Sequence, residues 1–178
     1  MRDVVVVSGG ATGIGRAVAE HFCRADAQVV IIGRRADRLA GTAEDISRRS
    51  DGGAPVVPIS GDLAAPEQVR DICAKIARRF AEVDVLVHAA GGNVVLHAVD
   101  GTYADGLDGV ARRWTDNFRS NVLTAVLLTE GLRDRLRSPG GRVIFVSSIA
   151  AYRGSGNGCY GAAKAALHPY CYDVAAAL

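Results

Sequence analysis

The sequence predicts an α/β fold in which helices cover both faces of a parallel β-sheet, the doubly wound arrangement of Rossmann-like proteins. Short runs rich in Val and Ile alternate with longer amphipathic stretches, as they do in βαβ units. The strand runs are continuously apolar rather than alternating, which indicates strands buried on both faces. A length of 178 residues suits one domain and leaves no room for a second. We therefore expect residues 1–178 to form a single domain.

Five strands and at least five helices follow from this pattern. We place the strands at residues 3–8, 28–32, 55–60, 83–88 and 142–147. Helices are expected at residues 13–25, 36–50, 66–80 and about 107–137, with a last helix from about Asn157 to Leu178. One apolar face of the long fourth helix is made by Trp114, Phe118, Val122, Val126 and Leu132. Residues 92–106 have Gly, Asp and Asn but no period, and they predict a loop at the mouth of a ligand crevice.

Charge and hydropathy exclude several functional classes. The net charge is +2, from 21 basic and 19 acidic residues interspersed along the chain, so nucleic acid is not an expected partner. The apolar runs are far shorter than the roughly 20 residues that a membrane helix needs. The first run is broken by Gly9 and Gly10 before it reaches the length of a secretory signal. We therefore expect a cytoplasmic protein without a membrane partner.

The cysteines do not form a recognisable framework. None of the four has CxxC spacing, and they stand at Cys23, Cys73, Cys159 and Cys171. We expect reduced, mostly buried thiols rather than disulfides or a zinc site. The alternative is a metal site that uses His21 with Cys23, which are close in the sequence.

A glycine-rich run follows the first strand and opens the first helix. It reads Ser8-Gly9-Gly10-Ala11-Thr12-Gly13-Ile14-Gly15. Glycines at such a turn let backbone N–H groups approach a pyrophosphate, whose charge the positive helix N-terminus then holds. The spacing differs from GxGxxG, and the alternative is a turn without a ligand. We expect a cofactor site here, contributed by Ser8, Gly9, Thr12, Gly13, Ile14 and Gly15.

The ends of the second and third strands indicate which dinucleotide would bind. The second strand ends in Gly33-Arg34-Arg35, where proteins that prefer NAD usually have a carboxylate for the ribose 2′-hydroxyl. Arg34 and Arg35 could instead hold a 2′-phosphate by charge-assisted hydrogen bonds, and the alternative is a solvated arginine pair. Asp62, with Leu63, follows the third strand and could meet the adenine amino group, or it could cap a turn. We therefore expect NADP(H), with NAD(H) as the second choice.

Tyr160 and Lys164 form a YxxxK pair on the predicted last helix. Positions i and i+4 lie one turn apart on one face, so the ammonium can stabilise the phenolate and allow proton transfer to a carbonyl oxygen. A serine hydroxyl from Ser147-Ser148 could hydrogen-bond that same oxygen. With five tyrosines and two lysines in 178 residues, about 0.06 such matches arise by chance. The pair therefore indicates catalysis rather than a surface contact.

Taken in order, these motifs resemble the short-chain dehydrogenase/reductase family in its compact form, over the whole chain. The resemblance implies that Ser148, Tyr160 and Lys164 are catalytic and that Asn121 anchors a proton relay through a bound water. It also implies that Lys164 holds the nicotinamide ribose. Ser148 is preferred because Gly154 follows it at the family's usual distance. The loop to Tyr160 is one residue shorter than usual, which leaves Ser147 as an alternative.

Two departures from the family pattern stand out. The Asn-Asn-Ala-Gly segment after the fourth strand reads His88-Ala89-Ala90-Gly91 here. We expect its sheet-tying side-chain bonds to be missing, His88 to be a strand-end histidine, and the backbone of Ala89, Ala90 and Gly91 to serve near the adenosine ribose. Family members continue with further strands, a lid helix and a Pro-Gly segment at the nicotinamide. The resemblance therefore implies a C-terminally truncated domain whose apolar fifth strand, Val143–Val146, has an unpaired edge and promotes association.

The expected activity is that of an NADP(H)-dependent oxidoreductase. It would interconvert a small-molecule carbonyl and an alcohol by hydride transfer, and resemblance suggests 3-oxoacyl thioesters or small ketones. The competing hypothesis is a catalytically incompetent dinucleotide-binding remnant or interaction module. A methyltransferase on a similar sheet would not explain Tyr160 together with Lys164. We also expect a homo-oligomer, because the long fourth helix and the Tyr160 helix resemble the pair that forms the family's dimer interface.

Overall fold

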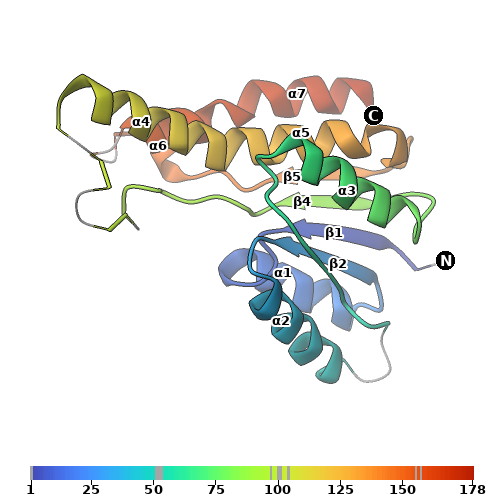
Figure 1. Ribbon diagram of the computed structural model, residues 1–178. Helices are drawn as coiled ribbons and strands as arrows, with labels where there is room; N and C mark the ends of the chain where they lie inside the picture. The colour runs from blue at the N-terminus through green and yellow to red at the C-terminus, as the bar shows by residue number, and fades with distance from the viewer. Residues whose placement is uncertain are drawn as a thin grey trace.

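A computed structural model shows one parallel five-stranded sheet between two layers of helices (Figure 1). It describes residues 2–50, 54–96, 98–99, 102–103, 105–154, 156 and 158–178. The strands are β1 (Val4–Ser8), β2 (Gln28–Gly33), β3 (Val57–Ser60), β4 (Val85–His88) and β5 (Arg142–Phe145). Their order is β3-β2-β1-β4-β5, and every pair is parallel. The doubly wound fold is therefore confirmed, with its switch point between β1 and β4.

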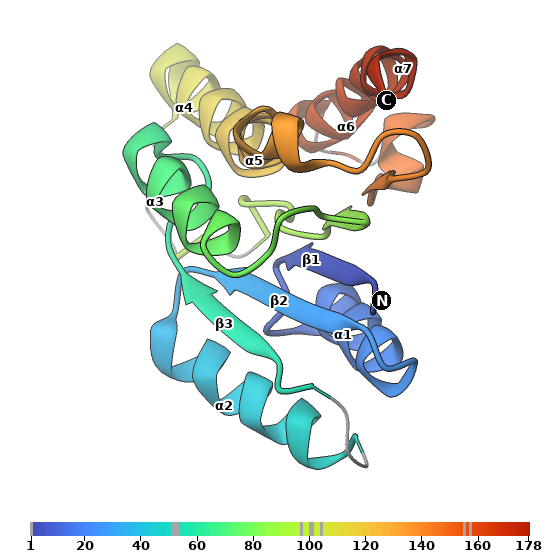
Figure 2. The ribbon, with the colours of Figure 1, turned by 90° about the vertical axis from the view of Figure 1, so that its right-hand side faces the viewer.

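The helices divide between the two faces of the sheet (Figure 2). Helices α1 (Gly13–Arg24) and α2 (Ala36–Arg48) cover one face. The other face carries α3 (Pro66–Ala77), α4 (Gly106–Phe118), α5 (Thr124–Leu132), α6 (Gly158–Ala165) and α7 (Leu167–Ala177). Successive strand residues point to opposite faces, so Val5 packs in the α1–α2 core while Val6 packs in the α3–α5 core. This double burial explains the continuous Val and Ile runs of the inner strands.

Strand β5 differs from the prediction that it is buried on both faces. Val143 and Phe145 pack toward α5 and α6, whereas Ile144 is 44% exposed. Ile144 lies beside Val87 in the register, on the face that α1 and α2 cover farther along the sheet. The expectation was wrong because β5 is an edge strand, and no described helix covers that side of it.

The long fourth helix is interrupted at Asn121. A π-helical turn, Arg119–Leu123, joins α4 to α5, and a 3₁₀ turn at Arg133–Arg135 follows α5. The expected apolar face is buried only in its second half, since Trp114 and Phe118 are about half exposed. A shift of the hydrogen-bond register by one residue inside a helix often marks a functional site.

The predicted last helix is two helices. Alpha-helical structure stops at Ala165 and resumes at Leu167, because Pro169 has no N–H to donate and its ring conflicts with the carbonyl of residue 165. The predicted start, Asn157, lies outside the described residues, as do parts of the 92–106 loop.

Three of the cysteines, Cys23, Cys73 and Cys159, are buried, and Cys171 is exposed. Within the described residues, no helix combines the length and the apolar character needed to cross a membrane.

Candidate active site

The candidate residues gather at the carboxyl edge of the sheet, because parallel strands all end there. Strand β1 ends at Ser8, β4 at His88, and β5 leads directly into Ser147 and Ser148. The Gly-rich turn connects β1 to the N-terminus of α1, and α6 begins beyond the β5 loop. The residues singled out from the sequence therefore lie along one edge.

The glycine-rich turn is packed so closely at Gly9 and Gly15 that neither position has room for a side chain. Gly9 has φ +69°, and a Cβ there would lie 2.8 Å from the carbonyl carbon of Ala89. At Gly15, a Cβ would lie 2.4 Å from the carbonyl oxygen of Gly9. The first turn of α1 contains no acidic residue, and its N-terminal N–H groups have no partner within the helix. The turn is thus shaped for the close approach of an anion.

Two buried polar side chains fasten the segment after β4. Ser8 Oγ accepts a 3.1 Å hydrogen bond from the Ala90 N–H. Asn121 accepts from the Gly92 N–H through Oδ1 and donates to the Gly92 carbonyl through Nδ2, both at 2.9 Å. A Cβ at Gly91, which has φ +129°, would lie only 2.5 Å from Asn121 Oδ1. The backbone of residues 89–92 is therefore held between β1 and the π-helical turn.

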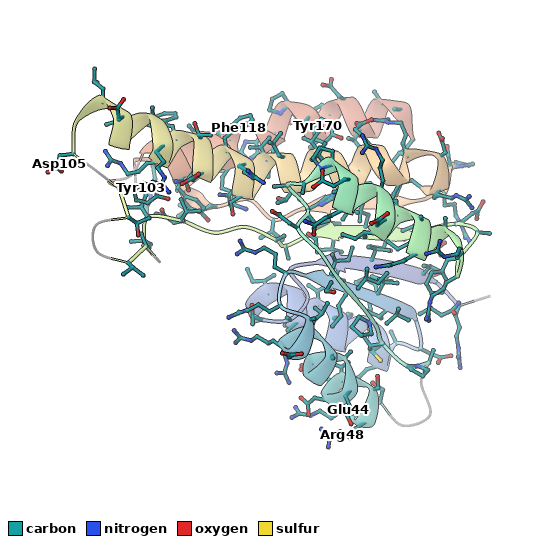
Figure 3. The ribbon with its side chains drawn as sticks, viewed as in Figure 1. Glu44, Arg48, Tyr103, Asp105, Phe118 and Tyr170 are labelled. Atoms are coloured by element: carbon teal, nitrogen blue, oxygen red, sulfur yellow. The ribbon has the colours of Figure 1, made fainter. Side chains whose placement is uncertain are left out.

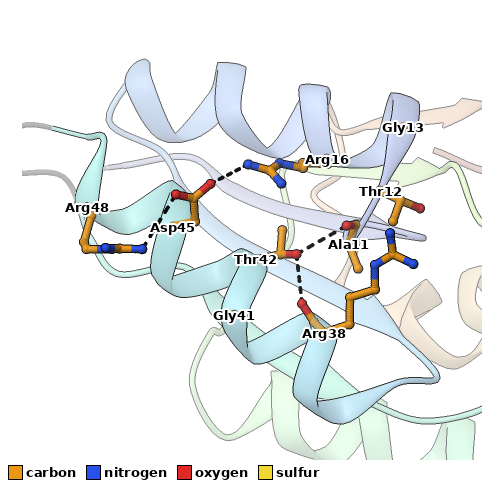
Figure 4. A pocket seen from close by; sticks show the side chains of 9 residues that line it. All are labelled: Ala11, Thr12, Gly13, Arg16, Arg38, Gly41, Thr42, Asp45 and Arg48. Carbon is orange, nitrogen blue, oxygen red and sulfur yellow. Dashed lines mark hydrogen bonds and ion pairs between the residues drawn. The ribbon is translucent and has the colours of Figure 1, made fainter.

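A groove of about 530 Å³ lies beside the glycine-rich turn (Figure 4). Its lining comes from the turn and from α1 and α2: Ala11, Thr12, Gly13, Arg16, Arg38, Gly41, Thr42, Asp45 and Arg48. The Arg38 guanidinium points toward Thr12, whereas Arg16 and Arg48 are paired with Asp45. Arg34 and Arg35 are exposed and do not line this groove. Sequence reasoning missed Arg38, although its place one turn into the helix after β2 was visible.

Asp62 and Leu63 lie where the sequence placed them, after β3. Asp62 accepts a hydrogen bond from the Ala64 N–H at 2.9 Å, and its carboxylate is 3.6 Å from Arg119. Leu63 is buried in the core shared with α3. Asp62 therefore caps a turn, and its contact with the adenine stays a prediction.

Lys164 is fixed to the end of β5. It is 5% exposed, and its Nζ donates a 2.9 Å hydrogen bond to the carbonyl of Val146. Burial lowers the pKa of Lys164 below its ordinary value. Tyr160 is half-buried one turn before it on α6. Gly161 lets α6 approach the turn after Ser148, since a Cβ there would lie 2.5 Å from the Ala150 carbonyl oxygen.

The two serines after β5 have different partners. Ser148 Oγ accepts a 3.2 Å hydrogen bond from the Ala150 N–H, which leaves its own hydroxyl proton available for donation. Ser147 Oγ is 2.8 Å from Nε2 of His168 on α7. The Ser147 hydroxyl therefore contacts a side chain of the neighbouring helix α7, whereas the Ser148 hydroxyl contacts the backbone of its own loop.

His88 joins the end of β4 to the helix layer above it. Its Nε2 lies 2.8 Å from Oγ1 of Thr129 on α5, and its ring stacks on Phe145 of β5 at 4.9 Å. The imidazole thus contacts α5 and β5 from the end of β4, as a strand-end histidine can, and these contacts are not the asparagine bonds whose absence the sequence predicts. Burial, together with the charge of Lys164, lowers the pKa of His88 to about 3.

Known proteins resemble this chain over nearly its whole length. The family model for short chain dehydrogenases matches residues 3–178. A short chain dehydrogenase from Pseudocercospora fijiensis is 32% identical over 175 residues, which are 97% of this chain and 54% of that protein. The chain spans 54% to 66% of the length of the first four curated relatives.

Two solved structures combine this fold with a bound dinucleotide. A Shigella flexneri short chain dehydrogenase complexed with NADP is 26% identical, with a TM-score of 0.78 over 93% of this chain and 67% of that one. L-sorbose reductase from Gluconobacter frateurii, complexed with NADPH and L-sorbose, is 29% identical, with a TM-score of 0.78 over 95% and 61%.

Proposed function

Because this chain belongs to the short chain dehydrogenase family, we propose that residues 1–178 form a dinucleotide-binding domain that interconverts a carbonyl and an alcohol. The observation that carries the proposal is the arrangement at the end of β5. Lys164 is buried and anchored to Val146, and Tyr160 stands one turn away on the same helix. Ser148, on the adjoining loop, retains its hydroxyl proton for donation. A cytoplasmic location is part of the same proposal.

The glycine-rich turn fits a nicotinamide dinucleotide. The absence of room for a Cβ at Gly9 and Gly15 matches a backbone that must approach a pyrophosphate closely. The binding residues we propose are Ser8, Gly9, Thr12, Gly13, Ile14 and Gly15 for the pyrophosphate region, with Asp62, Leu63, Ala89, Ala90 and Gly91 around the adenosine. Tyr160 and Lys164 would bind the nicotinamide ribose.

When bound, the nicotinamide supplies or accepts the hydride at the substrate carbon. In the reducing direction, Tyr160 donates its phenolic proton to the substrate oxygen as the carbonyl becomes an alkoxide. Ser148 donates a hydrogen bond to the same oxygen and stabilises its developing charge. Lys164 holds its positive charge one turn from the phenol and favours the phenolate. Asn121 would anchor a water through which the phenolic proton of Tyr160 is replaced.

The arginines beside the turn support a preference for NADP(H). Gly33 stands where a carboxylate would repel a 2′-phosphate, and Arg34 and Arg35 follow it. Arg38 adds a third guanidinium, directed at Thr12. A guanidinium can form bidentate, charge-assisted hydrogen bonds to phosphate. NAD(H) would lack that contact and is the second choice.

The substrate class that we propose is a small ketone or a 3-oxoacyl thioester. The similarity to L-sorbose reductase, whose structure contains L-sorbose, supports a carbonyl substrate.

We also propose that the chain associates with itself. A second copy of the chain would cover the apolar groove between α3, α4 and α6, which has a volume of about 880 Å³. Trp114 and Phe118 lie in that groove and are about half exposed.

A dinucleotide-binding module without catalysis is the alternative. The observation that favours it is the exposed face of β5 at Ile144, close to the loop that carries Ser148. One assay separates the two: the chain is mixed with NADPH and a panel of ketones, and nicotinamide absorbance is followed. Turnover that is lost in Tyr160→Phe supports the enzyme. Binding of NADPH without turnover of any ketone supports the module.

A further inference from the structure

A buried histidine sits at the end of β4, at a position where the mechanism proposed above gives it no part. His88 is 2% exposed, and the sheet register places it between Ser8 of β1 and Phe145 of β5. Its Nε2 contacts Thr129, but within the described residues its Nδ1 has no hydrogen-bond partner. A buried nitrogen without a partner is costly and calls for an explanation.

The 2.8 Å contact between Nε2 of His88 and Oγ1 of Thr129 fits two tautomers of the imidazole, because either group can donate the proton. When Nε2 carries the proton and Thr129 accepts it, Nδ1 keeps a free lone pair. Thr129 is followed by Glu130, whose carboxylate accepts a 2.6 Å hydrogen bond from Tyr170 of α7, and Figure 3 labels Tyr170.

The backbone around His88 brings Lys164 into the same region. The His88 carbonyl accepts a 3.0 Å hydrogen bond from the Val146 N–H, and the Val146 carbonyl accepts the hydrogen bond from Lys164 Nζ. The positive charge of Lys164 also acts on the imidazole and disfavours its protonation. An ammonium has three N–H donors, and Val146 occupies one of them.

We propose that His88 is a positioning residue for Lys164, in the tautomer that carries its proton at Nε2, with Nδ1 accepting the hydrogen bond of one water that bridges it to the ammonium. The bridging water would satisfy the buried Nδ1, for which the described residues supply no partner. The inference rests on the proposed role of Lys164 in binding the nicotinamide ribose. The burial that lowers the pKa of His88 to about 3 keeps the ring neutral, as an acceptor facing a cation requires. Lys164 on α6 is the charged group that acts on the ring, and Thr129, Phe145 and Ser8 surround it from α5, β5 and β1.

Substitutions at His88 can separate the two ring nitrogens. In His88→Asn the amide oxygen takes the place of Nδ1, whereas in His88→Gln the amide reaches the place of Nε2 and Thr129. His88→Phe keeps an aromatic ring against Phe145 and removes both nitrogens. If His88 acts through Nδ1, asparagine should substitute for it and glutamine should not, although glutamine keeps the contact with Thr129.

Nuclear magnetic resonance of the ¹⁵N-labelled chain without cofactor tests the geometry directly. Between about pH 6 and 8, long-range imidazole spectra should show His88 as the neutral Nε2–H tautomer, with the Nδ1 resonance displaced from that of a free lone pair. Lys164→Met should return the Nδ1 resonance to the free position. Lys75→Met, which replaces the chain's other lysine on the exposed side of α3, should leave it unchanged. An Nδ1–H tautomer, or an undisplaced Nδ1 in the wild type, would overturn the proposal without any variant having to fold.

Cofactor affinity provides the second readout. NADPH should bind His88→Asn within about twofold of the wild type, and His88→Gln and His88→Phe about 5- to 10-fold more weakly, at unchanged circular dichroism. Equal affinity in all three variants would contradict a positioning role. If the wild type binds no NADPH at all, the proposed function fails, while the resonance measurements still decide the geometry of His88.

Discussion

The Lys164 ammonium donates a 2.9 Å hydrogen bond to the carbonyl oxygen of Val146, and this contact fastens α6 to the end of β5. A lysine that is 5% exposed loses most of its hydration, so its remaining partners determine where its charge is held. Because Tyr160 lies one turn earlier on the same helix, the contact also fixes the phenol relative to the loop that carries Ser148. The relative positions of the proposed catalytic groups, Tyr160 and Ser148, therefore depend on one buried cation.

Variants of this pair should separate proton transfer from binding. Tyr160→Phe removes the exchangeable proton and should abolish ketone reduction while NADPH still binds. Lys164→Ala should weaken both, because it removes the ribose contact and the charge near the phenol, and leaves Val146 without its donor. Initial rates and NADPH titration of the same preparations measure the two effects. Near-normal turnover in Tyr160→Phe would remove it as the acid.

Arg34, after β2, and Arg38, in the groove, should control the choice of cofactor. A charge-assisted hydrogen bond contributes about 1.5 to 3 kcal/mol, so Arg34→Ala or Arg38→Ala should weaken NADPH binding roughly 10- to 150-fold and leave NADH almost unchanged. Arg48→Ala is the matched control, since that guanidinium lines the same groove but pairs with Asp45 at 3.7 Å. Equal losses for NADPH and NADH would argue against a 2′-phosphate contact.

Gly15 in the glycine-rich turn should tolerate no side chain. Gly15→Ala places a Cβ 2.4 Å from the Gly9 carbonyl oxygen, so the turn must shift. We expect a loss of about 1–3 kcal/mol in unfolding free energy, together with loss of NADPH binding. Gly41→Ala, in open space on α2, should instead raise stability by about 0.5–1 kcal/mol. Urea unfolding measures both, and an undisturbed Gly15→Ala would mean that the packing here is looser than described.

His88 should make stability depend on pH. Its pKa is about 3 in the folded chain and near 6.5 when unfolded, so below pH 6.5 the unfolded chain binds a proton that the folded chain does not. The contribution is fully present above pH 6.5 and is lost progressively as the pH falls toward 3. Urea midpoints should therefore drop between about pH 7 and 5, where carboxylates titrate little, and His88→Asn should flatten that drop. An identical slope in His88→Asn would show that this histidine is not buried neutral.

Self-association should depend on the groove formed with α4. Replacing Phe118 or Trp114 by Arg places a charge on the apolar lining and should shift the chain toward monomers in size-exclusion chromatography with light scattering. Leu107→Arg changes an exposed apolar residue on the same helix outside the groove, and it should leave the distribution as it was. A wild type that is monomeric at every concentration tested would exclude this interface.

The sequence predicts the architecture well because helices bury its inner strands on both faces. Continuous Val and Ile runs, as in β1 and β2, are the direct consequence of that burial. The placement of Tyr160 and Lys164 on one helix follows from their spacing alone. The local sequence pattern is sufficient to predict features that depend only on residues close together in the chain.

The features that sequence reasoning missed depend on distant contacts or on hydrogen-bond register. The π-helical turn at Asn121 shifts the backbone bonds without disturbing the apolar spacing around it. The exposure of Ile144 depends on which elements cover β5, and the bond of His88 to Thr129 joins residues 41 positions apart. The break before α7 is different, because it could have been predicted from the sequence: Pro169 cannot donate a backbone hydrogen bond inside a helix.

The central claim is that this edge of the sheet binds NADP(H), and titration with NADPH and NADH tests it most directly. Nicotinamide fluorescence is followed as the purified chain is added to each cofactor, in the wild type and in Gly15→Ala. We expect saturable binding of both cofactors, tighter for NADPH, and loss of both in Gly15→Ala. Absence of saturable binding of either cofactor to the folded wild type, or binding that Gly15→Ala leaves intact, would contradict the account.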